Sequence, residues 1–162
     1  LRTLLAQSAF KGAPYPTSLD LLAAIRAQAP ADKQALITDL FERITLYDVR
    51  ATKAVATSRP DGRYDLALTV VAKKLYADGQ GRERQAPMAE DLDVGAFSLS
   101  PDKKDFDHSK VLGFERRPIH SGTQTVVMTV DSIPRFAGID PYAKIIDRNL
   151  DDNTIAVERG AK

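Results

Sequence analysis

The sequence contains no cysteine and no tryptophan, and only two of its 162 residues are histidine. The absence of cysteine excludes disulfides, thiolate zinc sites and cysteine nucleophiles. His108 and His120 are too few for an ordinary zinc site, which takes three or four ligands, and neither lies in a His-Glu-x-x-His helix. A metal role is therefore a minor alternative, for which His108, beside Asp105 and Asp107, is the better candidate.

Long apolar runs and an excess of one charge are also lacking. No stretch approaches the roughly 20 apolar residues that a helix needs to span a bilayer, and no signal peptide is recognisable. We therefore expect no direct membrane insertion of this chain. Lys and Arg number 23 against 22 Asp and Glu. Nucleic-acid binders carry a basic excess on one face, so a nucleic-acid partner is not expected.

Catalytic motifs are the third absence. No Gly-x-Ser-x-Gly elbow occurs, and Gly79-Gln-Gly81 lacks the Lys-Ser/Thr ending of a phosphate loop. Acidic clusters at 90–93, 102–107 and 147–153 offer oxygen ligands, but we recognise no twelve-residue calcium loop, so calcium is a minor alternative. Asp151-Asp152-Asn153 is interpreted as a capping or turn element. We predict no catalytic, cofactor-binding or metal-binding residue in this chain.

The apolar residues that are present follow a helical spacing up to about Ile44. Leu1, Leu4 and Leu5 begin an amphipathic helix that ends at Gly12-Ala-Pro14. Thr17 or Ser18 is the expected N-cap of a second helix. A third helix is predicted by an apolar stripe that we expect to be buried, formed by Leu36, Ile37, Leu40, Phe41 and Ile44.

From Thr45 onward the apolar period changes to two, which predicts strands. Turns are predicted at 59–62 and 78–81, and a hairpin across Ser121-Gly122. The expected inward positions include Tyr47, Val49, Ala51, Leu66, Leu68, Val70, Leu92, Val94, Ala96, Met128 and Val130. The predicted fold class is mainly β with an N-terminal α segment. Residues 1–44 form a helical segment, the end of a preceding helical region, and residues 45–162 form an antiparallel Ig-like β-sandwich.

The segment 136–153 combines turn residues, an aromatic and several charged groups. Gly138 is expected in a tight turn, and Asp140-Pro141 in a transition from extended chain to turn. Asp147 and Arg148 are expected to make local charge-assisted hydrogen bonds. Three apolar residues are expected to pack into the sandwich: Tyr142, Ile145 and Ile146. The same segment is compatible with an interface to a neighbouring domain.

Three segments, in this order, resemble a known family. They are Pro14-Tyr-Pro-Thr-Ser-Leu-Asp20, Leu40-Phe-Glu-Arg-Ile-Thr-Leu-Tyr-Asp48 and Gly138-Ile-Asp-Pro-Tyr-Ala-Lys-Ile-Ile-Asp-Arg148. The resemblance is to the C-terminal end of bacterial proteins in which an ABC-type permease is fused to a zinc aminopeptidase of the aminopeptidase N-like, or gluzincin, kind. It implies a parent polypeptide with membrane helices and a zinc-containing peptidase domain upstream. No position here matches that family's zinc ligands or catalytic glutamate.

The resemblance predicts a non-catalytic C-terminal accessory domain, a soluble part of a membrane protein, that braces the peptidase domain or mediates protein contacts. The upstream peptidase domain is the expected partner, with the permease domain as a second candidate. The start at Leu1 rather than Met agrees with a piece of a longer chain. The expected interface residues are Leu4, Leu5, Tyr15, Asp140, Tyr142, Asp147 and Arg148.

The alternative function is an independent Ig-like module that binds a protein or carbohydrate partner. It predicts a contiguous aromatic or polar patch on the sandwich loops, around Phe106, Phe114 and Tyr76. Aromatic residues make up only 7% of the chain, and most occur where a core would use them. We therefore favour the accessory domain over the independent module.

Overall fold

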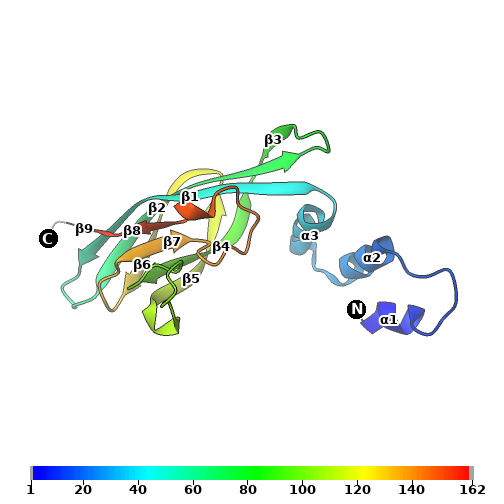
Figure 1. Ribbon diagram of the computed structural model, residues 1–162, viewed down its shortest axis with the longest axis horizontal. Helices are drawn as coiled ribbons and strands as arrows, with labels where there is room; N and C mark the ends of the chain where they lie inside the picture. The colour runs from blue at the N-terminus through cyan, green and yellow to red at the C-terminus, as the bar shows by residue number, and fades with distance from the viewer. Residues whose placement is uncertain (1, 161–162) are drawn as a thin grey trace. The chain divides into compact units, whose positions relative to one another are not determined.

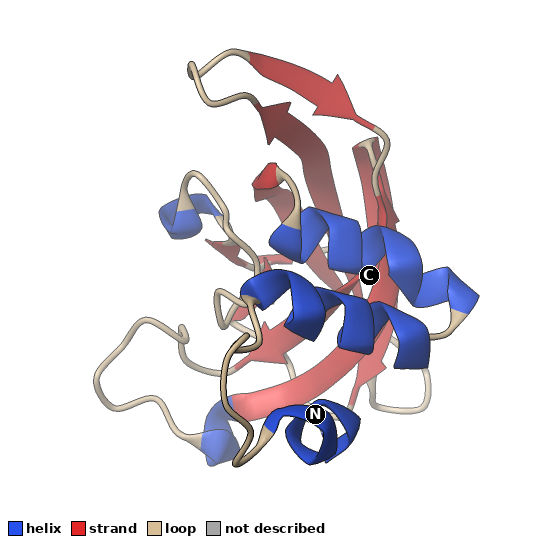
Figure 2. Ribbon diagram, turned by 90° about the vertical axis from the view of Figure 1, so that its right-hand side faces the viewer, coloured by secondary structure: helices blue, strands red, loops and turns tan. Residues whose placement is uncertain are grey.

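The computed structural model describes residues 2–160, so Leu1, expected in the first helix, and residues 161–162, at the end of the expected sandwich, lie outside the described residues. The chain divides into two compact units, Leu1–Ile44 and Thr45–Lys162. The first unit is helical and the second consists of strands in two sheets (Figures 1 and 2). The mainly β fold with N-terminal helices follows the change of apolar period in the sequence. Within residues 2–160, no helix combines the length and apolarity that crossing a membrane demands.

The helical unit contains α1 (Arg2–Ser8), α2 (Ser18–Gln28), the 3₁₀ turn η1 (Ala31–Lys33) and α3 (Gln34–Phe41). Thr17 caps α2 as predicted. Its hydroxyl accepts from Asp20 N, and the Asp20 carboxylate accepts in turn from Thr17 N at 2.7 Å. Helices α2 and α3 lie side by side (Figure 2), where Arg26 donates hydrogen bonds to Thr38 and Glu42.

The apolar stripe predicted for the third helix is mostly not buried. Ile37 is buried, but Leu36, Leu40, Phe41 and Ile44 are exposed. A period of 3.6 indicates a helix with one apolar face, but it does not identify what covers that face.

The second unit is a β-sandwich. One sheet contains β1 (Ile44–Ser58), β2 (Tyr64–Ala77), β3 (Glu83–Ala86), β6 (Gly122–Val130) and β9 (Glu158–Arg159). The other contains β4 (Ala89–Phe97), β5 (Val111–His120), β7 (Phe136–Ile139) and β8 (Thr154–Ala156), in the order β5-β4-β7-β8. Strand β2 pairs antiparallel with β3 and β6, β4 pairs antiparallel with β5 and β7, and β7 pairs antiparallel with β8. Strand β9 runs parallel to β1, and Tyr47 forms a parallel bridge with Asp147.

The sandwich core consists of the inward residues of both sheets. The alternation predicted for the strands is confirmed, because Val49, Leu66, Leu68, Val70 and Val94 are almost completely buried. The two predicted turns are also present. Gly62 and Gly81 both have positive φ angles, of 83° and 80°, which glycine adopts without steric cost.

The hairpin predicted across Ser121-Gly122 is wrong. Strands β5 and β6 follow each other in the sequence, but β5 pairs with β4 and β6 pairs with β2 in the other sheet. The chain therefore crosses from one sheet to the other at this turn. The crossing places Met128 and Val130 in the core, opposite the second sheet. An isolated two-stranded hairpin would leave these two side chains exposed.

Gly138 does not form a turn either. It lies inside β7, where a Cβ atom would stand 2.6 Å from Thr154 Oγ1 and 2.8 Å from the carbonyl oxygen of Asn153. Glycine is needed there for the close approach of the neighbouring chain rather than for its φ angle.

Candidate functional site

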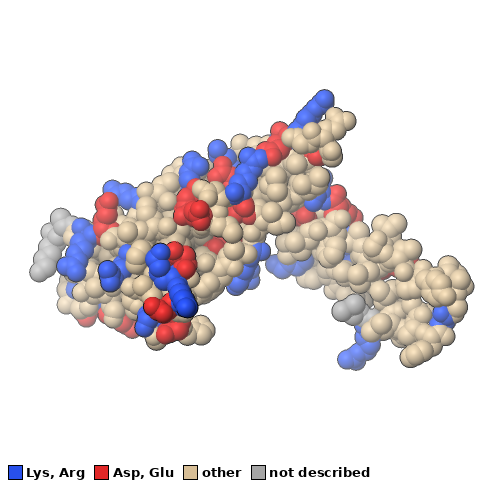
Figure 3. Space-filling view, viewed as in Figure 1, with Lys and Arg blue, Asp and Glu red and all other residues tan. Residues whose placement is uncertain are grey.

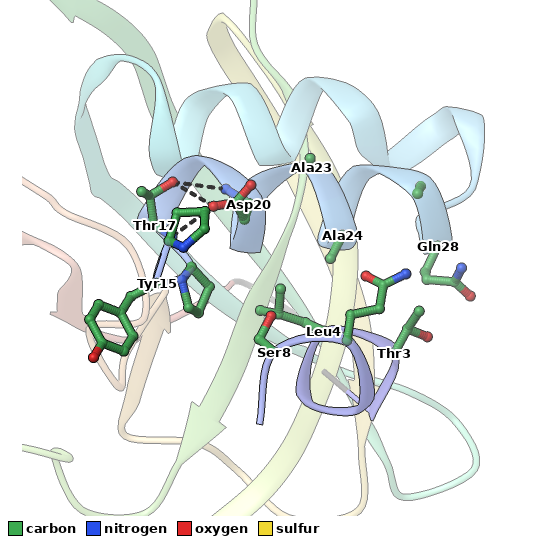
Figure 4. Close-up of a pocket in the computed structure, with 13 residues that line it drawn as sticks. Thr3, Leu4, Ser8, Tyr15, Thr17, Asp20, Ala23, Ala24 and Gln28 are labelled. Carbon is green, nitrogen blue, oxygen red and sulfur yellow. Dashed lines mark hydrogen bonds between the residues drawn. The ribbon is translucent and has the colours of Figure 1, made fainter. Parts of the chain in front are cut away.

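The predicted interface residues of the helical unit lie around a groove between α1 and α2. Leu4 and Tyr15 line this groove, whose volume is about 580 Å³ (Figure 4). Leu5 does not line it, but its side chain is 61% exposed, and that of Tyr15 is 73% exposed. The α2 wall consists mainly of small residues, Ala23, Ala24 and Ala27, so the helix surface is open to a neighbour.

Exposed apolar side chains are concentrated in this unit. Besides Leu5 and Tyr15, the large exposed apolar residues are Phe10, Leu19, Leu36, Leu40, Phe41 and Ile44. Few charged side chains lie on the face of the unit in Figure 3, whereas charges of both signs are interspersed over the sandwich. The unit therefore presents an apolar surface of the kind that partners cover.

Two of the predicted residues of the sandwich, Asp140 and Tyr142, lie near the outer face of the second sheet. On β4, Asp93 and Phe97 alternate with the core residues and point away from the core. Both are buried nevertheless, because the loop carrying Phe106 and the turn carrying Tyr142 cover them. The ring centroid of Phe97 lies 5.7 Å from that of Phe106 and 6.5 Å from that of Tyr142.

The aromatic cluster continues to the surface. The rings of Tyr142 and Phe114 lie 5.2 Å apart, and both side chains are exposed. Tyr142 was expected inside the sandwich, and Ile146 with it, but both are exposed and only Ile145 packs against the core. The burial of a turn residue depends on which neighbour covers it, and the apolar pattern of the turn does not identify that neighbour.

Asp140 organises the turn that carries Tyr142. Its φ angle is 42°, and its carboxylate accepts hydrogen bonds from Lys144 N at 3.0 Å and from Ile145 N at 3.1 Å. Lys144 Nζ lies 2.5 Å from the buried carboxylate of Asp93, and Arg116 Nε lies 3.8 Å from it. Both carboxylates are therefore committed to the structure, and neither is positioned as a free general base.

Burial raises the pKa of Asp140, which is 2% exposed, and the neighbouring Asp93 carboxylate raises it further. The two backbone N–H groups and the Lys144 ammonium oppose this shift. Burial likewise raises the pKa of Asp147, against hydrogen bonds led by that of Asn149 N. Raised carboxyl pKa values mark functional sites in enzymes, but here burial by structural contacts explains them.

Asp147 accepts a local hydrogen bond from Asn149 N, and both Asp147 and Arg148 also connect segments that are distant in the sequence. Tyr47 N donates to the Ile146 carbonyl at 2.9 Å, and Arg148 N donates to the Tyr47 carbonyl at 3.0 Å. The Asp147 carboxylate faces β1 at Val49 N, and the Arg148 guanidinium forms an ion pair with Glu83 of β3. The structure thus brings Asp140 and Tyr142 together in one turn and places Asp147 and Arg148 at the edge of β1.

Among residues 2–160, no three His, Asp or Glu side chains converge in a group that could hold a metal ion. His108 lies in the 3₁₀ turn η2 (His108–Lys110), where Asp107 accepts from Ser109 N at 2.7 Å as a helix cap. His120 ends β5 and is exposed.

Sequence reasoning missed Phe97, and it named Asp93 and Asn153 only as members of acidic or turn segments, without predicting that they are buried. The first two lie at alternate positions of β4 with Gly95 between them, and the Phe97 ring lies over Gly95, where a Cβ would stand 2.2 Å from Phe97 Cζ. In the sequence, the signal that the outer face of this strand is covered was a phenylalanine two residues after a glycine, both on the outward-facing side. Comparison with protein-family models, curated proteins and solved structures finds no match for this chain.

Proposed function

We propose that this chain is a non-catalytic accessory domain of a membrane-linked, zinc aminopeptidase-like protein, where it braces the peptidase domain or mediates protein contacts. The three ordered segments of the sequence support the family. The observation that carries the role is the exposed apolar surface of the helical unit, including Leu5 and Tyr15. Helices of 7, 11 and 8 residues are too short to be stable without packing partners, so a covering partner supplies stability.

The proposed partner is the peptidase domain upstream in the same polypeptide, and the permease domain is the second candidate. The peptidase domain would hold the zinc ion and the catalytic residues. This chain would contribute an apolar contact through the helical unit and a polar, aromatic surface around Tyr142 and Lys144 on the sandwich.

The test of the docking role uses the peptidase domain of the parent polypeptide as a separate chain. Leu5→Glu should weaken its binding to this chain about tenfold or more, because a charge is placed in a desolvated apolar contact. Val127→Glu is the matched control, since Val127 is an exposed apolar residue on the sandwich. Equal binding by both variants, measured by titration calorimetry, would contradict docking through the helical unit.

The test of the non-catalytic role is an assay of this chain with aminoacyl chromogenic amides and added zinc. We expect no release of the chromophore above the rate with zinc alone. Turnover that a chelator abolishes would overturn the accessory role, whatever the docking experiment shows.

A second function is favoured by one observation, the aromatic cluster. Phe106 and Phe114 were predicted to form a recognition patch, and both rings contact Tyr142. Tyr76 is not part of it, because that ring lies on β2 beneath the Arg84 guanidinium, 5.0 Å from its centroid. An independent Ig-like module would bind a sugar or peptide at Phe114 and Tyr142. Phe114→Ala should then abolish binding in a ligand panel that Tyr76→Ala leaves unchanged.

A further inference from the structure

The segment between β7 and β8 contains buried polar atoms without partners. Asn153 is 2% exposed, yet neither Nδ2 nor Oδ1 of its side chain has a hydrogen-bond partner among the described residues. The same holds for Asp147 Oδ2. The Asn153 amide lies close enough to Asp147 to lower the pKa of its carboxyl, although burial outweighs this effect. Asp147 Oδ2 and Asn153 Oδ1 are therefore buried acceptors that a donor or a cation would satisfy, whereas Asn153 Nδ2 is a donor.

The same loop contains further oxygen atoms of the kind that bind metal ions. Asp147 Oδ1 accepts from Asn149 N at 3.3 Å, and Asn149 Oδ1 accepts from Asp151 N at 3.3 Å. Asn149 Nδ2 donates to Asp152 Oδ2 at 3.0 Å. Carboxylate, amide and carbonyl oxygens are the ligands of hard divalent cations, above all of calcium.

The spacing of these residues matches part of a calcium-loop pattern. Asp147, Asn149 and Asp151 stand at positions 1, 3 and 5 of a twelve-residue pattern whose last position is Glu158. Asp152 occupies the place of the usual glycine, and the flanking segments are strands rather than helices. The loop is therefore not an EF-hand, but the oxygen-bearing side chains in its first half stand at the same positions as the metal ligands of an EF-hand loop.

We propose that this loop is a calcium site, with Asp147 Oδ2 and Asn153 Oδ1 as its protein ligands at the buried end. Water and the neighbouring loop oxygens complete the coordination at the exposed end. Because no three acidic side chains converge in the described residues, the ligand charge is low. Low ligand charge places the site in the weak class, with a dissociation constant of about 0.1–1 mM. This site is independent of the accessory function.

A calcium ion here would join three parts of the sandwich. Asp147 is bridged to β1 at Tyr47, and the backbone carbonyl oxygen of Asn153 accepts a hydrogen bond from Ile139 N of β7 at 2.9 Å. Asn153 immediately precedes β8. Binding would therefore tie the last segment of the chain to both sheets, and it should raise the temperature of unfolding of the sandwich.

The test is a titration of the full chain with calcium chloride, read by calorimetry and by thermal unfolding, with magnesium chloride as the comparison. Wild type should bind one calcium ion and unfold at a higher temperature as calcium is added up to about 10 mM, well above the expected dissociation constant. Magnesium should have a smaller effect. A wild type with neither binding heat nor a thermal shift overturns the proposal, and a water molecule then satisfies the buried atoms.

Two variants separate a ligand from a structural side chain. Asp147→Asn keeps the Oδ1 acceptor but removes the charge, and it should weaken calcium binding about tenfold or more. Asn153→Asp should bind calcium about tenfold more tightly, since it adds a charged ligand, and should be less stable without calcium. A purely structural Asn153 predicts the loss of stability without the gain in affinity, which would overturn the proposal.

Asp107→Asn is the matched control. Asp107 holds a similar turn by accepting from Ser109 N, in an exposed loop elsewhere on the sandwich. The Asp107→Asn substitution should leave calcium binding unchanged. An equal loss of affinity in Asp107→Asn and Asp147→Asn would show that calcium binds nonspecifically to acidic loops, and it would also overturn the site.

Discussion

At the scale of single residues, the chain from Gly138 to Asn153 is held to both sheets by contacts that tolerate little change. Gly138 lies where β7 meets the start of β8. Asp140 turns the chain with a carboxylate that accepts two backbone N–H groups. Gly138 is required because its neighbours leave no space for a Cβ atom, and Asp140 is required because its carboxylate accepts hydrogen bonds from the turn. Each residue therefore gives a prediction for one substitution.

Gly138→Ala should destabilise the sandwich by roughly 1–3 kcal/mol, as overpacking does in a well-packed interior. The added Cβ would stand 2.8 Å from the Asn153 carbonyl oxygen, which is backbone and cannot rotate away. Gly79→Ala is the control, since nothing lies within 4 Å of a Cβ there. The free energy of unfolding in urea measures both. Equal values would mean that β8 shifts without cost.

The raised pKa of Asp140 predicts a pH dependence of stability. The folded state holds the Asp140 proton up to a higher pH than the unfolded state, mainly because the carboxyl is buried. The contribution of this group to stability is therefore largest below its ordinary pKa of 3.8 and is lost as the pH rises through the raised value. The difference in free energy of unfolding, wild type minus Asp140→Asn, should increase as the pH falls from 7 toward 4. A difference independent of pH would contradict the raised pKa.

At the scale of the elements, local patterns identify helices and strands but not their partners. The alternation of β1 is interrupted where Thr52 and Lys53 are both exposed, and the inward positions continue at Ala54 and Ala56. Such an irregularity keeps a long strand's apolar residues on the core side as the strand twists. In the helical unit, by contrast, α2 depends on its cap and on Arg26 more than on burial, because none of its residues is buried.

Thr17→Ala should destabilise α2 by about 1 kcal/mol, because the capping hydroxyl is lost from the box with Asp20. Amide hydrogen exchange of residues 18–28 should become faster by about five- to tenfold, since 1.4 kcal/mol corresponds to a factor of ten. Thr17→Ser keeps the hydroxyl and should show nearly the wild-type rates. Exchange in the sandwich strands should not change. Similar rates in both variants would show that the box does not stabilise this helix.

At the scale of the whole molecule, the two units differ in how they are stabilised. The sandwich buries a continuous core from both sheets, from Tyr47 in β1 to Ile139 in β7. In the helical unit, Ile37 and Asp39 are the buried residues of α3, and the described residues of α1 and α2 are exposed or half-buried. The helical unit therefore buries much less apolar area than the sandwich. Because buried apolar area is the main stabilising contribution to folding, the helical unit gains less stability from its own packing.

Limited proteolysis should therefore cut residues 2–44 first and leave a resistant fragment that begins near Thr45. The reason is that cleavage follows local opening, which is most frequent where few apolar contacts hold the backbone. Mass spectrometry of the fragments identifies the first cuts. Early cleavage in sandwich loops such as 100–107, with the helices intact, would show that the helical unit is the more stable one.

Much of the fold was predictable because it depends on local periodicity. The change of period at Thr45, the cap at Thr17 and the glycine turns at Gly62 and Gly81 all follow from the chain itself. The partner of β6 was not predictable, because pairing with β2 joins residues such as Leu68 and Val126 that lie far apart in the sequence.

The candidate sites divide in the same way. The sequence alone determined that the chain has helices with apolar faces, alternating strands and an acid-rich loop at 147–153, since composition and spacing are local properties. Only the tertiary structure decided that Asp93 and Asn153 are buried, that Tyr142 joins Phe106 and Phe114, and that the stripe of α3 is exposed. Burial is a property of what packs against a residue, and that neighbour comes from elsewhere in the chain or from another molecule.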